Sequence, residues 1–342
     1  MKKIRVGIIG FGLSGRVFHA SLLRGHPGYE ILAVSSSREQ EVKAFLPHVE
    51  VVGDPQLILR HPNLDLVINC APNGFHYSYS ATALEFGKHV VIEKPFVNSI
   101  AEGERLIEMA KQQKKVLSVF HNRRWDADFL TVKKLIKTGR LGEIKQFESH
   151  MDRWRPTARA ERWREQPLEG SGLFYDLGPH LIDQTILLFG TPDHIMADIQ
   201  CQKNAGQIDD YFHAVLYYGK MRAILHSSSF ASTTPRFQIF GDRAEFTKYS
   251  VDPQEQQLRL EVSPDAPSFG FEEEKLFGTL TNPEGTEIVE SEKGRYRNYY
   301  DELYSALTLG DEPPVTAVDA LRVMKIIELA RQSSSEGRVV KI

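Results

Sequence analysis

Cysteine and long apolar runs are both scarce in this sequence. Only Cys70 and Cys201 occur among its 342 residues, so we expect no disulfide framework and a reducing, cytoplasmic environment. No stretch approaches the roughly 20 apolar residues that a membrane-spanning helix needs. The apolar run near the start covers only Val6 to Ile9, which is too short for the core of a secretory signal. We therefore expect neither a secreted disulfide scaffold nor a membrane protein.

An excess of charge of either sign is also missing. The net charge is -3, with 25% charged and 41% hydrophobic residues, which is ordinary for a globular protein. A nucleic-acid or anionic-membrane partner would favour a strongly basic chain. The arginine-rich stretch at residues 153–164 contains Glu161 and is followed by Glu165, so we expect a loop over a site or against another subunit. The length fits two domains.

A glycine-rich turn follows the first predicted strand, Ile4 to Ile9. Helical spacing of apolar residues begins soon after it, at Val17. In such a turn the first glycine allows the tight bend, the second admits a pyrophosphate, and the third lets the helix pack closely on the strand. The pattern in this context predicts a dinucleotide-binding turn, the alternative being a purely structural one. The predicted cofactor contacts are Gly10, Phe11, Gly12, Leu13, Ser14 and Gly15.

The second predicted strand, Glu30 to Val34, ends without an acidic residue. In NAD-preferring proteins a carboxylate near this position binds the ribose 2′-hydroxyl. Here Ser35-Ser36-Ser37-Arg38 follows, and the first carboxylate is Glu39. Hydroxyls and a guanidinium match a 2′-phosphate, so we favour NADP(H) over NAD and include all four residues among the cofactor contacts. The alternative is a polar loop whose arginine points into solvent.

Strands and helices continue to alternate through the first third of the chain. Buried strands are predicted at Leu64 to Ala71, Val90 to Ile92 and Val116 to Phe120, with helical patterns between them. This alternation predicts a doubly wound parallel sheet, a Rossmann domain over residues 1–122. The turn after the Leu64 strand lies at a carboxyl end and should line the cofactor. Its predicted contacts are Ala71, Pro72, Asn73 and His76.

The strand at Val90 ends in Glu93-Lys94-Pro95. Proline has no N–H to give to a sheet, so Lys94 lies at the carboxyl end of the strand. Ligands bind just outside these ends in open parallel sheets, although lysines are mostly solvated surface residues. We predict that this tripeptide contacts the cofactor and that its lysine contacts the substrate as well.

Residues 123–342 predict a second α/β domain. Strand-like runs at short spacing, from His194 to Tyr249, indicate a large, mainly antiparallel open sheet. Alternation places Tyr211, His213, Val215 and Tyr217 on one face. Residues 250–293 carry little pattern. A final helix near residues 316–333 is expected to pack back near the first domain.

A second polar constellation occurs at residues 170–183. Asp176, His180 and Asp183 have i, i+4 and i+7 spacing, which places them on one helix face if Pro179 lies in the first turn. One interpretation is a solvated or capping arrangement with Asp176 as N-cap. Another is a metal site, but nothing nearby in sequence completes a ligand set, so we predict no metal. The third is general acid–base chemistry.

Hydride chemistry requires this third arrangement. When an alcohol gives its hydride to a nicotinamide, the protein must accept the hydroxyl proton and stabilise the developing charge. We assign the base to His180, the hydrogen bond to the reacting oxygen to Lys94, and orientation to Asp176. The predicted substrate contacts are Lys94, Asn122, Arg123, Arg153, Asp176 and His180.

These motifs, in this order and spacing, resemble the Gfo/Idh/MocA oxidoreductases along essentially the whole chain. The resemblance implies a Rossmann domain followed by an α/β domain whose open sheet forms subunit contacts in homodimers or homotetramers. It also implies a catalytic set of Lys94, Asp176 and His180, and a peptide bond before Pro95 that is often cis.

A narrower likeness is carried by Ser118 to Asp126, Arg162 to Glu165 and Asp252 to Glu255. These stretches are similar to the branch that holds NADP-dependent scyllo-inositol dehydrogenases. The resemblance implies hydride transfer between NADP(H) and a secondary alcohol or ketone of scyllo-inositol, scyllo-inosose, or a related inositol or sugar. Ala71-Pro72 departs from the Thr-Pro that is frequent in the wider family. The alternatives are a catalytically silent nucleotide-sensing regulator and an NAD-dependent glycosidase, against which Arg38 counts.

Overall fold

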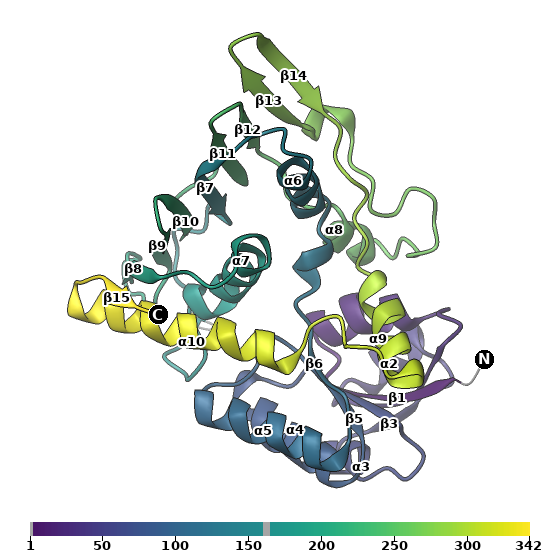
Figure 1. Cartoon of the computed structure of the whole chain (residues 1–342). Helices are drawn as coiled ribbons and strands as arrows, with labels where there is room; N and C mark the ends of the chain where they lie inside the picture. The colour runs from purple at the N-terminus through teal and green to yellow at the C-terminus, as the bar shows by residue number, and fades with distance from the viewer. Residues whose placement is uncertain (1–2, 160–164) are drawn as a thin grey trace. The chain divides into compact units, whose positions relative to one another are not determined.

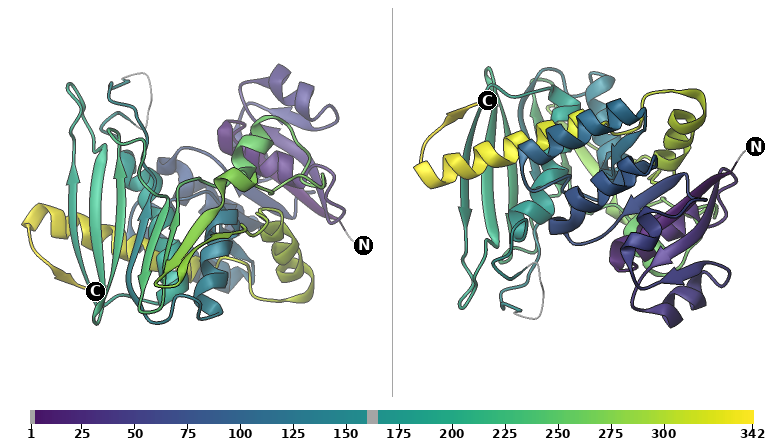
Figure 2. Two further views of the ribbon diagram at one scale, coloured as in Figure 1. Left: turned by 90° about the horizontal axis from the view of Figure 1, so that it is seen from above. Right: turned by 90° about the horizontal axis from the view of Figure 1, so that it is seen from below.

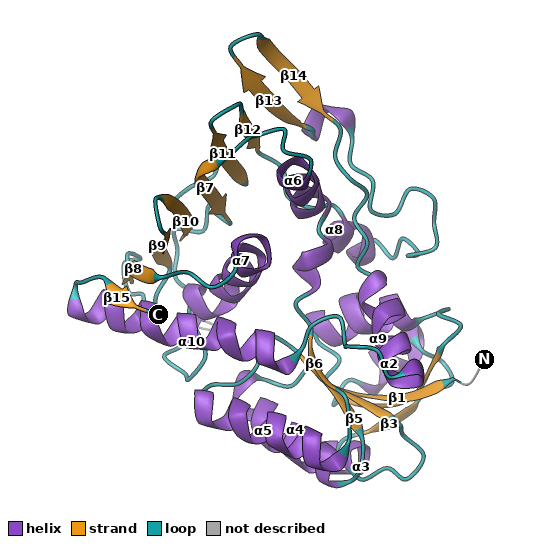
Figure 3. Ribbon diagram, viewed as in Figure 1, coloured by secondary structure: helices purple, strands orange, loops and turns teal. Residues whose placement is uncertain are grey.

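The computed structural model describes residues 3–159 and 165–342. The chain divides into two compact units. Figures 1 and 3 show the helices and strands of both units. The first unit consists of Met1–Asn122, Gln254–Phe269 and Arg295–Leu321, and the second of Arg123–Pro253, Gly270–Gly294 and Arg322–Ile342.

The first unit is built on a parallel sheet of six strands in the order β3-β2-β1-β4-β5-β6. The order reverses between β1 and β4, as in doubly wound folds, so the predicted Rossmann architecture is confirmed. Near-continuous apolar runs form these strands because helices cover both faces of such sheets. The strands are β1 (Ile4–Ile9), β2 (Tyr29–Ser35), β3 (Glu50–Val52), β4 (Leu66–Asn69), β5 (His89–Ile92) and β6 (Leu117–Val119).

Two helices of the first unit, α3 and α5, begin at local capping residues. Asp54 accepts a hydrogen bond from the Gln56 N–H, and Ser99 accepts one from the Glu102 N–H, so each caps the helix that follows. The helices are η1 (Ser14–Ala20), α1 (Ser21–Leu23), α2 (Glu39–Phe45), α3 (Pro55–Leu59), η2 (Asn73–Phe75), α4 (His76–Glu85), α5 (Ile100–Gln113), α8 (Gln254–Arg259) and α9 (Asn298–Leu309).

Two late stretches, which the sequence analysis placed in the second domain, belong to the first unit. Aromatic packing accounts for the second of them. Tyr299 and Tyr300 of α9 are buried, and their ring centroids lie 4.8 Å from that of Phe120 and 5.5 Å from that of Tyr29, respectively. The Tyr299 hydroxyl also donates to Ser118 Oγ at 2.8 Å. Large buried aromatic surfaces of this kind dominate core energetics.

The second unit contains a sheet of nine strands in the order β14-β13-β12-β11-β7-β10-β9-β8-β15. Among the described strands β7 and β10 pair in parallel and the other pairs are antiparallel, which confirms the mainly antiparallel open sheet. Figure 2 shows several of these strands side by side in teal and green. They are β7 (Ile144–His150), β8 (His194–Gln200), β9 (Tyr211–Tyr218), β10 (Met221–Ser228), β11 (Phe237–Gly241), β12 (Glu245–Lys248), β13 (Gly278–Asn282), β14 (Gly285–Val289) and β15 (Val340–Lys341).

The two faces of this sheet differ. Phe147, Phe212 and Phe237 are fully buried on one face, where the Phe212 ring centroid lies 5.0 Å from that of Phe174 in α7. Alternate residues, such as His213 on β9, are half-buried on the other face. The helices of this unit are, from Arg123 onward, η3 (Asn122–Trp125), then α6 (Ala127–Lys137), α7 (Leu173–Phe189), η5 (Glu274–Leu276) and, from Arg322 onward, α10 (Ala317–Glu336).

Residues 250–293, which carried little sequence pattern, are ordered by a buried ion pair. Lys248 Nζ lies 2.6 Å from Glu272 Oε2, and both side chains are fully buried. The same ammonium donates to Ser250 Oγ and Leu276 O, both at 2.8 Å. Buried polar contacts therefore hold the segment that leads to the β13–β14 hairpin. Hydrophobic periodicity cannot predict such contacts.

Candidate active site

Backbone geometry explains the glycines after β1. Gly10 has φ +87°, a conformation that L side chains rarely adopt. A Cβ on Gly15 would lie 2.0 Å from the Gly10 carbonyl oxygen, so a side chain there would force the helix away from the strand. A Cβ on Gly12 would meet only Arg38 Nη2 within 4 Å, at 3.9 Å. The turn therefore has no room for a side chain at Gly15, where the helix packs on the strand, and is open at Gly12, where a pyrophosphate would approach. These residues fit a dinucleotide.

Arg38 lies against this glycine turn. Its Nη2 donates to the Phe11 carbonyl at 2.5 Å, and its Nη1 donates to Glu41 Oε2 at 3.3 Å. The side chain is about half exposed. Ser36 Oγ accepts a hydrogen bond from the Arg38 N–H at 3.1 Å, which fixes the start of the loop after β2. The arrangement places a guanidinium and neighbouring hydroxyls beside the turn.

Glu93 follows β5 and is the centre of a buried polar network. Its Oε1 accepts from Ser14 Oγ and lies 3.0 Å from His19 Nε2, while its Oε2 accepts from the Lys94 N–H at 3.0 Å. Burial alone would raise the pKa of this carboxyl, but the hydrogen bonds from His19 and Ser14, the charge of His19 and that of Lys94 lower it to about 2. The carboxylate therefore connects Ser14 and His19 of η1 to the backbone N–H of Lys94. Sequence reasoning missed the His19 partner, because it is separated by many residues.

The peptide bond between Lys94 and Pro95 is cis. His76 holds this segment, since its Nδ1 lies 2.7 Å from the Pro95 carbonyl oxygen and its Nε2 lies 3.1 Å from that of Ala71. Burial lowers the pKa of this imidazole, with the nearby carbonyls and Glu93 acting in the opposite direction. His76 thus positions the turns after β4 and β5, and its predicted contact with the cofactor stays a prediction.

One edge of the parallel sheet brings the predicted cofactor residues together. Gly10–Gly15, Ser35–Arg38, Ala71–His76 and Glu93–Pro95 follow the carboxyl ends of β1, β2, β4 and β5, and Asn122 lies shortly beyond β6. These four strands are neighbours, so their carboxyl ends lie along the same edge. Lys94 is half-buried there, and Asn73 and Asn122 are buried.

In the second unit, Asp209 caps the helix that carries the other candidates. The Phe174 N–H donates to Asp209 Oδ2 at 2.7 Å, and a Cβ on Gly172 would lie 2.2 Å from Asp209 Oδ1. The N-cap residue is Gly172, so the capping interpretation of Asp176 is wrong. The expectation for Pro179 is also wrong, because α7 begins at Leu173 and the proline lies inside the helix.

Asp183 of α7 is held by an ion pair with Arg124. Asp183 is 2% exposed and accepts two hydrogen bonds from Arg124, at 2.9 Å from Nε and 2.7 Å from Nη2. This bidentate pair gives Asp183 a structural use. His180 is 5% exposed and Asp176 is half-buried in the first turns of the same helix. Their i, i+4 spacing places the two on one face of α7, which leaves them as the acid–base candidates of this unit.

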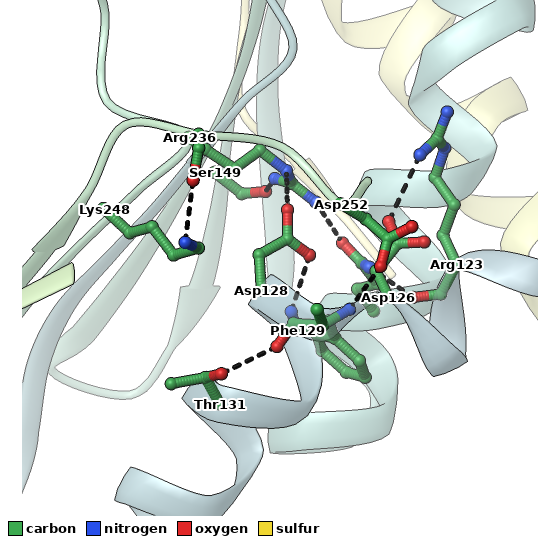
Figure 4. A network of polar contacts seen from close by, with 12 residues as sticks. Arg123, Asp126, Asp128, Phe129, Thr131, Ser149, Arg236, Lys248 and Asp252 are labelled. Carbon is green, nitrogen blue, oxygen red and sulfur yellow. Dashed lines mark hydrogen bonds and ion pairs between the residues drawn. The ribbon is translucent and has the colours of Figure 1, made fainter. Parts of the chain in front are cut away.

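Buried polar groups fix the position of α7 within the second unit. Arg236 Nη2 donates to Gln184 Oε1 at 2.8 Å, and its Nε lies 3.2 Å from Asp128 Oδ2 of α6. The same guanidinium donates to Ser149 Oγ of β7 at 2.6 Å. Figure 4 shows Arg236 between Asp128 and Ser149, with Asp126 and Asp252 nearby. One arginine therefore connects α6, α7 and the sheet.

The remaining predicted substrate residues lie in the second unit. Arg123 Nη1 donates to Asp126 Oδ2 at 3.2 Å, and the Arg153 N–H donates to the Ser228 carbonyl at 3.0 Å. The Arg153 side chain is half-buried. Three residues of the narrower likeness, Arg162, Trp163 and Arg164, lie outside the described residues.

Within the described residues, no helix is both long enough and apolar enough to cross a membrane.

Comparisons with known proteins agree with this architecture. The sequence profile for the NAD-binding Rossmann fold of the Gfo/Idh/MocA oxidoreductase family matches residues 4–121, and that for the family's C-terminal alpha/beta domain matches residues 133–342. The chain is 42% identical over 344 residues to the scyllo-inositol 2-dehydrogenase (NADP(+)) IolW of Bacillus subtilis (strain 168), covering 99% of this chain and 96% of that protein. It is 44% identical over 336 residues to the uncharacterized oxidoreductase YdgJ of Escherichia coli (strain K12), covering 97% and 96%.

A solved structure described as an oxidoreductase, yvaA from Bacillus subtilis, superposes with a TM-score of 0.96 at 42% identity, covering 100% of this chain and 99% of that one. The chain therefore belongs to the Gfo/Idh/MocA family of oxidoreductases, with a nucleotide-binding Rossmann domain followed by the family's α/β domain.

Proposed function

We propose that this chain is a cytoplasmic, NADP(H)-dependent oxidoreductase that interconverts a secondary alcohol and a ketone of a polyol. The substrate class is scyllo-inositol and scyllo-inosose, or a related inositol or sugar. The observation that carries the proposal is Arg38, whose guanidinium lies on the Phe11 carbonyl of the glycine turn. The relative named scyllo-inositol 2-dehydrogenase (NADP(+)) supports the substrate class.

The choice of NADP(H) rests on charge at the end of β2. The strand ends at Ser35, and Ser36, Ser37 and Arg38 follow with no carboxylate before Glu39. A 2′-phosphate carries negative charge and acceptor oxygens, which an arginine fork and hydroxyls bind, whereas a ribose 2′-hydroxyl is bound by an acidic residue. Arg38 and the serines would therefore hold the adenosine 2′-phosphate.

Three side chains divide the remaining chemistry. A bound nicotinamide supplies the site that accepts or returns the hydride. Lys94, in the turn after β5, would hydrogen-bond the substrate oxygen and stabilise its negative charge. His180 would take the hydroxyl proton on an imidazole nitrogen and return it in the reverse reaction, and Asp176, one helical turn earlier, would orient that imidazole. Asn122, Arg123 and Arg153 would bind other hydroxyls of the polyol.

We further propose that the chain forms a homodimer or homotetramer through the open sheet. On the face opposite α7, β9 carries the half-buried side chains of Tyr211, Val215 and Tyr217, and Met196 of β8 is 46% exposed. Tyrosine and methionine are enriched in subunit contacts.

A substrate panel tests the proposal. Purified full-length chain is given inositols and aldoses with NADP⁺ or NAD⁺, and the absorbance of the reduced nicotinamide is followed. We expect turnover with scyllo-inositol or a close relative, and a KM for NADP⁺ at least about tenfold below that for NAD⁺. Dinucleotide binding without turnover of any substrate would favour the silent regulator. Stoichiometric NAD(H) retained through purification, with glycoside cleavage, would favour the glycosidase.

A further inference from the structure

Three histidines lie in register across adjacent strands of the second unit. His226 of β10 pairs with His213 of the antiparallel strand β9 on one side and with His150 of the parallel strand β7 on the other. All three are half-buried and belong to the face of the sheet opposite the buried phenylalanines. The Rossmann chemistry proposed above uses none of them.

Asp152, just beyond β7, brings a carboxylate to two of these imidazoles. Its Oδ1 lies 3.0 Å from His226 Nδ1, and its Oδ2 lies 3.7 Å from His150 Nδ1. One potential ligand atom from each of the three residues lies within 4.8 Å of the other two. Both Nδ1 atoms are buried, yet within the described part of the chain neither makes a hydrogen bond of normal geometry. A group that binds all three residues at once would satisfy these nitrogens.

We propose that His150, Asp152 and His226 bind a divalent transition-metal ion of the zinc class. Imidazole nitrogen and carboxylate oxygen are ordinary zinc ligands at about 2.0–2.2 Å, so two ligands of a tetrahedral ion lie about 3.3 Å apart. His226 Nδ1 lies 3.0 Å from Asp152 Oδ1 and His150 Nδ1 lies 3.7 Å from Oδ2, so each imidazole is close to the separation that two ligands of one ion have. Small rotations of the two imidazoles complete the approach, and water takes the fourth position because the site is half-buried.

The surroundings of the ligands are those that metal sites need. His150 Nε2 lies 3.0 Å from Glu148 Oε2, so the imidazole can donate its other N–H to a carboxylate while Nδ1 faces the ion. The Asp152 carboxylate is fixed by the Ser228 N–H, which donates to Oδ1 at 2.6 Å, and by the Thr234 hydroxyl, which donates to Oδ2. Its side chain is 3% exposed. These contacts orient the three ligands in the absence of the metal. The bound ion would link His150 of β7 to His226 of β10.

Metal binding by the tag-free, chelator-treated full-length chain tests the proposal. Calorimetric titration with zinc chloride should give one equivalent per chain, and cobalt chloride should give the visible absorption of a four-coordinate ion. His226→Gln and His150→Gln should each weaken zinc binding at least tenfold, while His213→Gln, the neighbour in the same row, should bind as the wild type does. Circular dichroism checks that each variant is folded.

X-ray absorption of the zinc-loaded wild type provides a readout that needs no variant. Two imidazole nitrogens with oxygen ligands would support the site, and fewer than two imidazoles would overturn it. Absence of stoichiometric zinc or cobalt binding by the wild type would also overturn it, because the histidines and carboxylate would then form only a polar network. Equal loss in His213→Gln and His226→Gln would have the same meaning. The inference does not depend on the proposed redox activity, which the substrate panel measures separately.

Discussion

The polar residues of the two units are assembled in different ways. In the first unit the predicted cofactor residues lie in turns directly after strands. Gly10–Gly15 and Glu93–Pro95 are therefore recognisable as short motifs, and the strand before each one determines its position at the sheet edge. In the second unit Arg236 joins α6, α7 and β7, and His226 meets His150 only through strand register. Local motifs therefore identify the cofactor residues of the first unit, whereas register and packing create the histidine row and the Arg236 contacts of the second.

The largest expected effect comes from removing Arg236, whose contacts hold α6, α7 and β7 together in the second unit. Arg236→Ala leaves Asp128 as a fully buried carboxylate without its cation. Removing one member of a buried ion pair destabilises by about 3–5 kcal/mol, so the midpoint of urea unfolding should fall strongly. Arg222→Ala is the control, because Arg222 lies over the Tyr217 ring at the partly exposed face and should contribute about 1 kcal/mol or less. Similar losses in both variants would contradict the assignment of Arg236 as the anchor.

The sequence predicted much of the fold because hydrophobic periodicity reports strands and helices directly. It also predicted the glycine turn after β1 and the position of Lys94 just beyond the end of β5, since in both cases a local residue pattern determines a position at a strand end. Alternation correctly placed Tyr211 and His213 on one face of β9. It could not add His150 and His226 to that face as neighbours, because the order of strands in the nine-stranded sheet is a non-local property.

The incorrect expectations have the same origin. The N-cap interpretation, one of three for Asp176, rests on a local pattern, but the Phe174 N–H at the start of α7 is bound by Asp209 from a distant loop. That distant cap lets the helix start at Leu173, which places Pro179 in its interior. The aromatic side chains Tyr299 and Tyr300 carried a helical pattern but no indication that they pack on Phe120 and Tyr29.

The next largest effect is expected at Lys94, in the motif that follows β5 of the first unit. Lys94→Ala should lower kcat by about 10²–10³-fold, the loss seen when one donor to a developing oxyanion is removed. NADPH binding, followed by fluorescence titration, should change by less than about threefold, because the glycine turn and Arg38 remain. Lys111→Ala on the exposed surface of α5 is the matched control. Turnover like that of the wild type would remove Lys94 from the mechanism.

A smaller effect is expected at Arg38. A hydrogen bond to a charged group contributes about 1.5–3 kcal/mol, so Arg38→Gln should reduce the preference for NADPH over NADH by roughly 10–100-fold. The measurement is the ratio of kcat/KM for the two cofactors, which a general loss of activity does not change. Glu41→Gln removes only the exposed partner of Arg38 and should keep the preference. An unchanged ratio in Arg38→Gln would mean that another residue selects the cofactor.

The smallest effect concerns a single imidazole of the first unit that is satisfied by the backbone. His89 Nδ1 accepts a hydrogen bond from the Val116 N–H at 2.9 Å, which requires the neutral ring. Burial, aided by the charge of Lys115, lowers the pKa of His89 to about 4. An unfolded histidine titrates near pH 6.5, so the stabilisation is complete above about pH 6.5 and is lost as the pH falls toward 4.

A variant with an amide at this position separates His89 from the other titrating groups. The side-chain oxygen in His89→Asn can accept from the Val116 N–H at every pH, so the variant lacks this contribution to the pH dependence. The free energy of unfolding by urea, measured at pH 7 and pH 5, should therefore fall more in the wild type than in His89→Asn. Parallel pH profiles would show that the Val116 hydrogen bond does not govern the titration. They would also remove the contrast between His89, which depends on one backbone N–H, and Arg236, which depends on side chains of α6, α7 and β7.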